Sequence, residues 1–106
     1  MKISLLVIRC QDIEVNKCFY ELLGLSFVKE KHGNGPTHYS CEHDGTVFEL
    51  YPNKGEHPQD NNRLGFKVAN LINIIKNVAV TSTYEFAGNT VHVLTDPDGR
   101  KVEISE

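Results

Sequence analysis

The sequence predicts an α+β protein built from two similar modules, each a strand, a helix and three further strands. The first observation is a repeat: residues 45–50 (GTVFEL) are echoed by residues 99–104 (GRKVEI), at an offset of 54 residues. The second is an apolar strand followed by a helix-opening polar residue, which occurs at residues 7–12 and again at 65–70, at an offset of 58. Duplication of one module, four residues shorter in the second copy, explains both offsets.

Module 1 spans residues 1–51. Period-two patterns and flanking turn residues predict strands at 3–9, 25–31, 37–42 and 46–51. Asp12 is the expected N-cap of a helix that ends before Gly24. Apolar side chains recur at helical spacing in this segment at Val15, Cys18, Phe19 and Leu22. The pair Asp44 and Gly45 predicts a tight hairpin turn.

Module 2 spans residues 63–106 and follows a linker at 52–62, a polar segment with two prolines and no periodicity. We expect strands at 63–68, 82–86, 90–95 and 101–105. A short helix is predicted over 70–78, with one apolar face made of Leu71, Ile74, Ile75 and Val78. The turn DPDG at 96–99 joins the last two strands, and the two modules together form one domain of 106 residues.

Composition excludes several classes of function. Three cysteines without C-x-x-C spacing indicate neither a disulfide framework nor a zinc knuckle, and a reducing cytoplasm fits them best. The apolar run at residues 3–8 is too short for a signal peptide or a membrane span. A net charge of −3 without a basic cluster gives no footprint for nucleic acid or a membrane surface. We therefore expect a cytoplasmic protein with neither partner.

Alternation along the strands predicts one apolar face and one charged face for each sheet. The apolar sets, such as Phe48 with Leu50 and Val102 with Ile104, must face the helices. The opposite, cleft-side face then collects five ionisable side chains: Arg9, Glu49, Arg63, Lys67 and Glu103. Because both glutamates follow a hairpin glycine at the same distance, two carboxylates are available to one site. The alternative is that they are ordinary solvent-facing strand residues.

Four segments together carry a family resemblance: residues 9–12 (RCQD), 19–25 (FYELLGL), 45–50 and 96–103 (DPDGRKVE). In combination they resemble the vicinal-oxygen-chelate superfamily, which includes glyoxalases, extradiol dioxygenases and bleomycin-resistance proteins. The resemblance covers nearly the whole chain. It implies two βαβββ modules whose curled mixed sheets form a cleft, and a homodimer that completes it.

The resemblance also implies four metal-ligand positions, typically His, Glu, His and Glu in the first, fourth, fifth and eighth strands. Glu49 and Glu103 match the two glutamates, but the histidine positions fall on Leu5 and Arg63. Leucine has no donor atom and arginine stays cationic, so we expect no bound metal and no other cofactor. The five histidines, expected to be surface or structural residues, are His32, His38, His43, His57 and His92.

A buried glutamate needs a partner to remain charged. Arg63 is one candidate, and a partly exposed ion pair without a functional role is the alternative. Tyr39 and Tyr51 are expected mainly to pack the sheet. The predicted ligand-binding cleft is lined by Leu5, Arg9, His38, Glu49, Tyr51, Arg63, Lys67 and Glu103.

Two functions remain open, beside a third possibility of a general α+β domain with a vestigial cleft. The first is a metal-independent protein of the glyoxalase and bleomycin-resistance type that holds a small organic ligand in a dimer cleft. The second is a metal-dependent lyase, isomerase or dioxygenase with an altered metal shell, or acid–base chemistry by Glu49 or Glu103. Loss of both histidine positions favours binding without catalysis. Three cations beside two acids on the cleft face favour a ligand that carries a carboxylate or phosphate.

Overall fold

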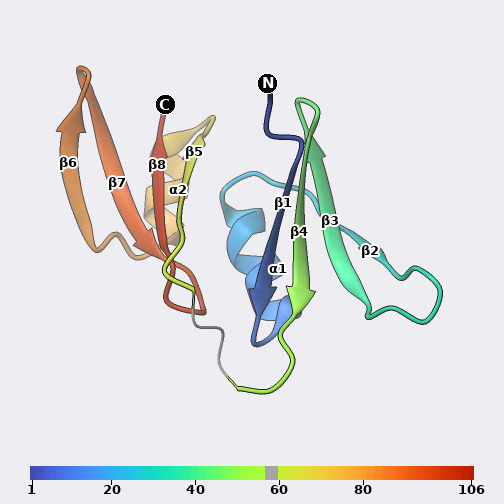
Figure 1. The fold of residues 1–106 in the computed structure, drawn as a ribbon. Coiled ribbons are helices and arrows are strands. Elements are labelled where there is room, and N and C mark those ends of the chain that lie inside the picture. Colours follow the sequence, from blue (N-terminus) through green and yellow to red (C-terminus); the bar gives the residue numbers. More distant parts are fainter. Residues whose placement is uncertain (57–59) are drawn as a thin grey trace.

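The computed structural model describes residues 1–56 and 60–106, in which two helices and eight strands follow one another as the repeat predicted. Figure 1 shows their arrangement. In chain order they are β1 (Leu5–Cys10), α1 (Ile13–Leu22), β2 (Val28–Glu30), β3 (His38–His43), β4 (Thr46–Pro52), β5 (Arg63–Lys67), α2 (Leu71–Asn77), β6 (Ser82–Phe86), β7 (Asn89–Thr95) and β8 (Lys101–Ser105). The α+β class and the two βαβββ modules are confirmed.

Each module forms one four-stranded mixed sheet with the same topology. The strand orders are β1-β4-β3-β2 in module 1 and β5-β8-β7-β6 in module 2. The first and last strands of each module pair in parallel, and the other pairings are antiparallel. Val7 pairs with Glu49 in one sheet and Gly65 with Glu103 in the other. The two offsets seen in the sequence therefore correspond to one shared strand register.

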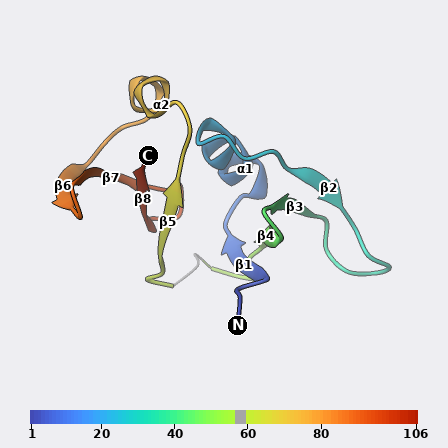
Figure 2. The ribbon, with the colours of Figure 1, turned by 90° about the horizontal axis from the view of Figure 1, so that it is seen from above.

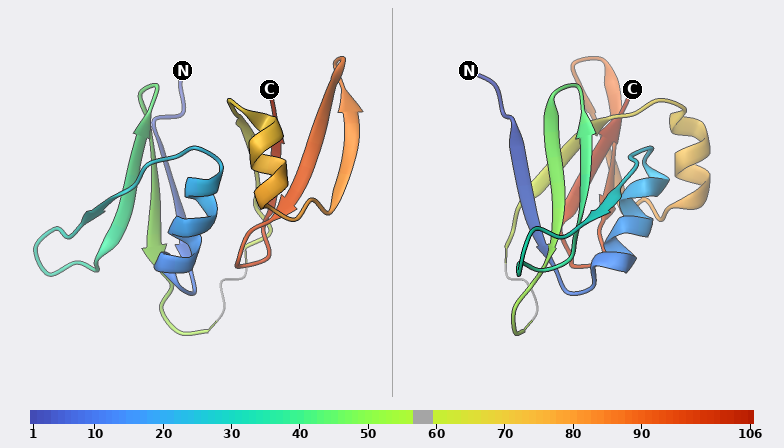
Figure 3. Two further views of the ribbon diagram at one scale, coloured as in Figure 1. Left: turned by 180° about the vertical axis from the view of Figure 1, so that it is seen from behind. Right: turned by 90° about the vertical axis from the view of Figure 1, so that its right-hand side faces the viewer.

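The helices lie on one side of the two sheets. In the view of Figure 2, α1 and α2 lie on the same side of β1 and β5, and within residues 1–56 and 60–106 no helix covers the opposite faces of the sheets. The view from behind has both helices in front of the strands (Figure 3). We call the face of each sheet turned away from its helix the open face.

A group of aromatic rings joins the modules on the helix side. Tyr20 of α1 lies edge-on to Phe48 of β4 at 5.2 Å and to Phe66 of β5 at 6.1 Å between ring centroids. Phe48 and Phe66 are themselves 6.0 Å apart. Large apolar surfaces from both modules are thus buried in a single core, which also contains Ile8, Leu50, Leu64, Ile74, Leu94, Val102 and Ile104.

Helix α1 begins where the sequence predicted but buries a different face. Asp12 caps it by accepting from the backbone N–H groups of Glu14 and Val15, at 2.9 and 3.3 Å. The stripe of Val15, Cys18 and Leu22 is exposed, whereas Asn16 and Tyr20 are fully buried. The expected apolar stripe is therefore wrong for these residues. The helix is turned toward polar partners in module 2, which hydrophobic periodicity does not detect.

Helix α2 keeps its predicted face, since Ile74 is buried and Leu71, Ile75 and Val78 pack against the core. Asn70 precedes this helix in a left-handed conformation, with φ of 59°, and within the described residues its side chain makes no capping hydrogen bond. Asn tolerates positive φ better than most residues, which suits it to this sharp entry.

Strand β2 is shorter than predicted, covering three residues of the expected seven. The hairpin at Asp44 and Gly45 is confirmed, with φ of 51° and 81° at its two central residues. A second two-residue turn, Ala87 and Gly88, joins β6 to β7 with φ of 50° and 82°. The sequence analysis did not single it out, because alanine is a rare choice where φ is positive.

Candidate functional site

The open faces carry the charged side chains, as the alternation predicted. Glu49 and Glu103 occupy equivalent central positions, and their side chains are only 15% and 18% exposed. Arg9, Arg63 and Lys67 are exposed. Leu64, Phe66, Val102 and Ile104 point instead to the helix side and join the core.

Glu49 has His38 as its neighbour in module 1. Nε2 of His38 lies 3.5 Å from Oε2 of Glu49, and the imidazole is 1% exposed. The expected pairing of an inward glutamate with Arg63 applies only to Glu103, where Nη1 of Arg63 lies 3.9 Å from Oε1 and the arginine side chain is half exposed. Such a long and solvated ion pair contributes about 0–1 kcal/mol to the free energy of unfolding.

Three side chains form a column on the open face of module 1. The rings of His38 and Tyr51 are stacked at 4.2 Å with an interplanar angle of 11°. The guanidinium of Arg9 lies 5.0 Å from the centroid of the Tyr51 ring. This places Tyr51 in the site, whereas Tyr39 is buried on the helix side and donates its hydroxyl to Glu14. The hydrogen bond from Tyr39, followed by the nearby Lys29, lowers the pKa of Glu14.

The same face brings in two residues that the sequence analysis left out of the cleft. Oε1 of Glu30 lies 3.3 Å from Nε2 of His38, and Nε2 of His32 lies 3.7 Å from the same oxygen. One ligand atom each from Glu30, His32 and His38 fall within 4.8 Å of one another. We call Glu30, His32, His38 and Glu49 the imidazole–carboxylate cluster. The alternation of Glu30 and His38 on facing strands was the sequence signal, but it required the pairing of β2 with β3.

The open face of module 2 is built differently. Glu103 accepts a hydrogen bond from the Tyr84 hydroxyl, which raises the pKa of that tyrosine. A hollow of about 330 Å³ lies over this sheet. Its lining includes Gly65, Lys67, Tyr84, Phe86 and Glu103.

The predicted cleft residues are therefore divided between two half-sites. Arg9 and Tyr51 line a separate hollow of about 410 Å³ on module 1, and Lys67 and Glu103 line the hollow of module 2. Leu5 lies on the open face of module 1 and is more than half exposed. It pairs with Val47, two residues along the strand from the pair of Val7 and Glu49.

The vicinal-oxygen-chelate superfamily, which the sequence resembles, holds its metal at four positions. In this chain the residues at these positions do not suit a metal ion. Leu5 offers no donor atom, and Arg63 places a permanent cation beside Glu103. Of the other histidines, His43 is exposed and lies 3.3 Å from Asp44, and His92 pairs with Ile104 on the helix side of β7. His57 lies outside the described residues.

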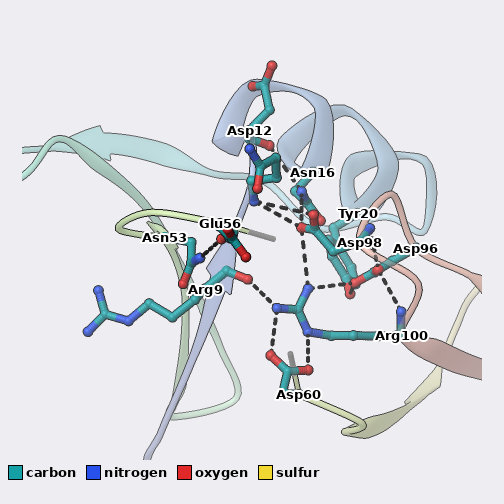
Figure 4. A network of polar contacts seen from close by, with 11 residues as sticks. Arg9, Asp12, Asn16, Tyr20, Asn53, Glu56, Asp60, Asp96, Asp98 and Arg100 are labelled. Carbon is teal, nitrogen blue, oxygen red and sulfur yellow. Dashed lines mark hydrogen bonds and ion pairs between the residues drawn. The ribbon is translucent and has the colours of Figure 1, made fainter. Parts of the chain in front are cut away.

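A buried polar network joins the modules at the ends of the sheets (Figure 4). Arg100 is 1% exposed, and its guanidinium binds both carboxylate oxygens of Asp60 at 2.8 Å and Asp96 at 3.1 Å. Tyr20 donates to Asp96 at 2.6 Å, and the Asn16 amide donates to Asp98 at 2.9 Å. The turn at 96–99, predicted only as a connection, thus adds polar contacts between α1 and module 2 to the aromatic ones.

This network is structural in its geometry. Every carboxylate in it accepts a hydrogen bond from a donor within the protein. Some of these bonds join α1 to the turn at 96–99, and the others lie within that turn or join Arg100 to Asp60. Cys10 lies near it, and burial raises the pKa of this thiol to about 12, so the thiol stays protonated and unreactive. The three cysteines, all within the described residues, are free.

Comparison with known proteins identifies the fold. A scan against protein-family models finds no match, and a search of curated proteins finds none either. Among solved structures, a glyoxalase/dioxygenase from Nostoc punctiforme has a TM-score of 0.76 at 21% identity, covering 98% of this chain and 89% of its own. A glyoxalase family protein from Enterococcus faecalis has a TM-score of 0.72 at 20% identity, covering 99% and 97%.

A third similar structure is an integron cassette protein from V. cholerae, with a TM-score of 0.71 at 25% identity, covering 99% of this chain and 94% of its own. These likenesses extend over nearly the whole chain in each case. The chain therefore has the paired-module fold of glyoxalase-type proteins, in agreement with the vicinal-oxygen-chelate resemblance of its sequence. Neither of the two helices in the described part of the chain is long and apolar enough to cross a membrane.

Proposed function

We propose that this protein binds a small organic anion on its open faces, in a cleft that a second copy of the chain completes, without a metal at the four superfamily positions. The observation that carries the proposal is the division of the cleft residues between two open half-sites, each lined by one module. The glyoxalase-type fold supports a small-molecule cleft as the general mode of action. Because Leu5 and Arg63 stand where the superfamily has histidine ligands, they support ligand binding rather than metal chemistry at those positions.

The charge on module 2 supports an anionic ligand. Arg63 pairs with Lys101 across β5 and β8, so both side chains project from the open face, and Lys67 extends from the same face. All three are exposed, and Glu103 is the acid among them. A carboxylate or phosphate placed over this sheet gains from three nearby cations, which would repel a polycationic compound.

Exposed apolar side chains support a second copy as the partner. Leu5, Val28, Tyr84 and Phe86 are 55%, 64%, 42% and 68% exposed, and all four lie on the open faces. A symmetric dimer that brought the module 1 face of one copy over the module 2 face of the other would bury them and close both half-sites.

Sedimentation and thermal-shift measurements test the proposal. We expect a dimer at micromolar concentration, and a rise in Tm of about 10 °C or more with the organic acid or phosphate monoester that binds at a hundred times its Kd, because such a ligand stabilises by about 2.7 kcal/mol. Arg63→Ala and Lys67→Ala should each reduce that rise. Lys76→Ala, an exposed lysine of α2, is the matched control and should not.

A monomer at every accessible concentration would count against the dimer. Stabilisation by a polycationic glycopeptide, with none by any organic acid, would reverse the charge argument.

A metal-dependent enzyme with an altered metal shell is the second candidate, favoured by the imidazole–carboxylate cluster, in which His38 lies against Glu30 and Glu49. One similar structure is a lactoylglutathione lyase from Agrobacterium tumefaciens, with a TM-score of 0.69 at 15% identity. Turnover of lactoylglutathione, measured in both the forming and the cleaving direction with protein supplied with Zn²⁺, Ni²⁺ or Mn²⁺, would favour this candidate. Loss of that activity in Glu49→Gln, with the fold retained, would place the reaction at this site.

A further inference from the structure

We propose that the imidazole–carboxylate cluster of module 1 binds a divalent transition-metal ion, at a place that shares Glu49 alone with the four superfamily positions. Glu30 at the end of β2, His32 in the following loop and His38 at the start of β3 supply the core of the site, and Glu49 of β4 borders it. Three of these residues lie outside the positions that the sequence comparison considered. The expectation that no metal binds rested on Leu5 and Arg63, and on the interpretation of His32 and His38 as surface or structural residues, which this proposal replaces.

His38 is the central observation. The imidazole is 1% exposed, and its Nε2 makes no hydrogen bond of acceptable geometry within the described residues. The other ring nitrogen, Nδ1, lies 3.2 Å from the carbonyl oxygen of Pro36. A carbonyl can only accept, so this contact fixes the hydrogen on Nδ1 and directs the lone pair of Nε2 toward the carboxylates.

A lone pair facing two carboxylate oxygens is unfavourable unless a cation lies between them. Nε2 of His38 is 3.3 Å from Oε1 of Glu30 and 3.5 Å from Oε2 of Glu49. A metal bound between them would convert this repulsion into coordination, with the Nδ1 contact to Pro36 in the orienting role that such second hydrogen bonds take. The alternative is a protonated His38 held as an ion pair, which would bind no metal.

The distances suit a metal. Four ligands at about 2.0–2.1 Å from a tetrahedrally bound ion lie roughly 3.3–3.4 Å from one another. The contacts of His38 Nε2 to Glu30 and Glu49, at 3.3 and 3.5 Å, are close to that length, and Nε2 of His32 is 3.7 Å from Glu30. The ligand atoms of Glu30, His32 and His38 fall within 4.8 Å of one another, so the exposed His32 side chain must move closer to complete the site.

The surroundings hold the buried ligand and leave an entry path. Stacking on Tyr51 fixes the plane of the His38 ring. The His32 side chain is 73% exposed, so an ion can enter from solvent past this residue. Two imidazoles with carboxylates favour zinc, nickel, cobalt or iron(II) over calcium or magnesium, which prefer oxygen donors alone.

Calorimetric titration with zinc, and the visible absorption of the cobalt complex, test the site on the full chain purified without a chelating tag. We expect one equivalent per chain at micromolar Kd or tighter. His32→Ala should weaken zinc binding at least about tenfold without unfolding the protein, since this side chain is exposed. Glu30→Gln should do the same and also change the cobalt spectrum.

Matched controls separate this cluster from other surface histidines and acids. His43 is equally exposed and also lies 3.3 Å from a carboxylate, so His43→Ala should leave affinity within about twofold. Glu42→Gln, an exposed acid of β3, is the control for Glu30→Gln. No uptake by the wild type, or equal losses in His32→Ala and His43→Ala, would overturn the proposal.

The metal site does not depend on the organic-anion function. Metal binding by His32→Ala and by the wild type is compared by calorimetry, whereas anion binding is measured by thermal shift with Arg63→Ala. Failure of one measurement therefore leaves the result of the other intact.

Discussion

The hydroxyl of Tyr20 donates a hydrogen bond of 2.6 Å to Asp96, and this bond ties helix α1 of module 1 to the turn after β7 of module 2. Both side chains are buried. The two residues are 76 positions apart, so the contact links the modules at the start of the DPDG turn that marks the second copy. Burial, followed by this hydrogen bond, raises the pKa of Tyr20 above its ordinary value.

Removing this hydroxyl should destabilise the protein. Tyr20→Phe leaves the ring in the core but removes one donor to the buried Asp96 carboxylate, and we expect a loss of about 1–3 kcal/mol in the free energy of unfolding. Urea denaturation followed by circular dichroism measures it. Tyr84→Phe, which removes an exposed hydroxyl from Glu103, is the control and should cost less. A Tyr20→Phe variant as stable as the wild type would show that Tyr20 contributes only through its ring.

Arg100 should matter more than any exposed cation. It faces Asp60, Asp96 and Asp98 within 3.6 Å. Arg100→Met would leave three acids without their shared counter-charge, and we expect a loss of about 3–5 kcal/mol. Lys101→Met, at the neighbouring exposed position, should change stability by less than about 0.5 kcal/mol in the same urea experiment. A small effect of Arg100→Met would mean that the acids find other donors.

The fold was predictable because the modules repeat. Two hairpin glycines, each followed four positions later by an acid, fixed the register of β4 and β8, and alternation then placed Glu49 and Glu103 on the open faces. The buried face of α1 was not predictable from the sequence. Its residues Asn16 and Tyr20 are buried because they hydrogen-bond to Asp98 and Asp96, which lie 82 and 76 positions away. Periodicity records apolar burial and is silent about polar partners that only the tertiary structure supplies.

The candidate site likewise contains residues that the sequence repeat could place and residues that it could not. The positions of Glu49, Glu103, Leu5 and Arg63 followed from the repeat, because equivalent strands place equivalent residues on one face. The grouping of Glu30 and His32 with His38 did not, because it depends on a three-residue strand and on the path of the loop after it. Local sequence gives neither the pairing of so short a strand nor the shape of the loop.

Alkaline pH should weaken the fold through Cys10. Burial raises the pKa of this thiol from 9.0 to about 12 in the folded protein. Above pH 9 the unfolded chain loses the thiol proton while the folded chain keeps it, so the unfolded state binds fewer protons and stability falls as pH rises toward 12. The slope from this one group is at most about 1.4 kcal/mol per pH unit.

Urea midpoints measured between pH 8 and 10 check this sign, since Tyr20 adds a term of the same sign above about pH 10. Cys10→Ala should flatten the decline between pH 9 and 10, even if it lowers stability at every pH. Cys18→Ala, at an exposed cysteine, should leave the slope of the wild type unchanged. An unchanged slope in Cys10→Ala would assign the decline to other groups.

The superfamily metal positions can be tested by rebuilding them. Leu5 and Arg63 are equivalent positions, since each lies two residues before the strand partner of a glutamate, Glu49 or Glu103. Leu5→His together with Arg63→His would give each half-site one imidazole and one carboxylate. If a second copy brings the half-sites together, four ligands then surround one zinc or nickel ion.

The experiment uses His32→Ala as its background, so that metal held by the imidazole–carboxylate cluster does not obscure the result. We expect no tight metal binding by the background protein, weak binding after either single change, and one equivalent of nickel per chain after both. Calorimetric titration measures the affinity, and sedimentation at the same concentrations measures the oligomeric state. Because the half-sites belong to different modules, affinity should fall when dilution produces monomers. A folded, dimeric double variant that takes up no nickel would show that Leu5 and Arg63 do not occupy the ligand positions. Full affinity in a monomer would show that the half-sites of one chain meet without a second copy.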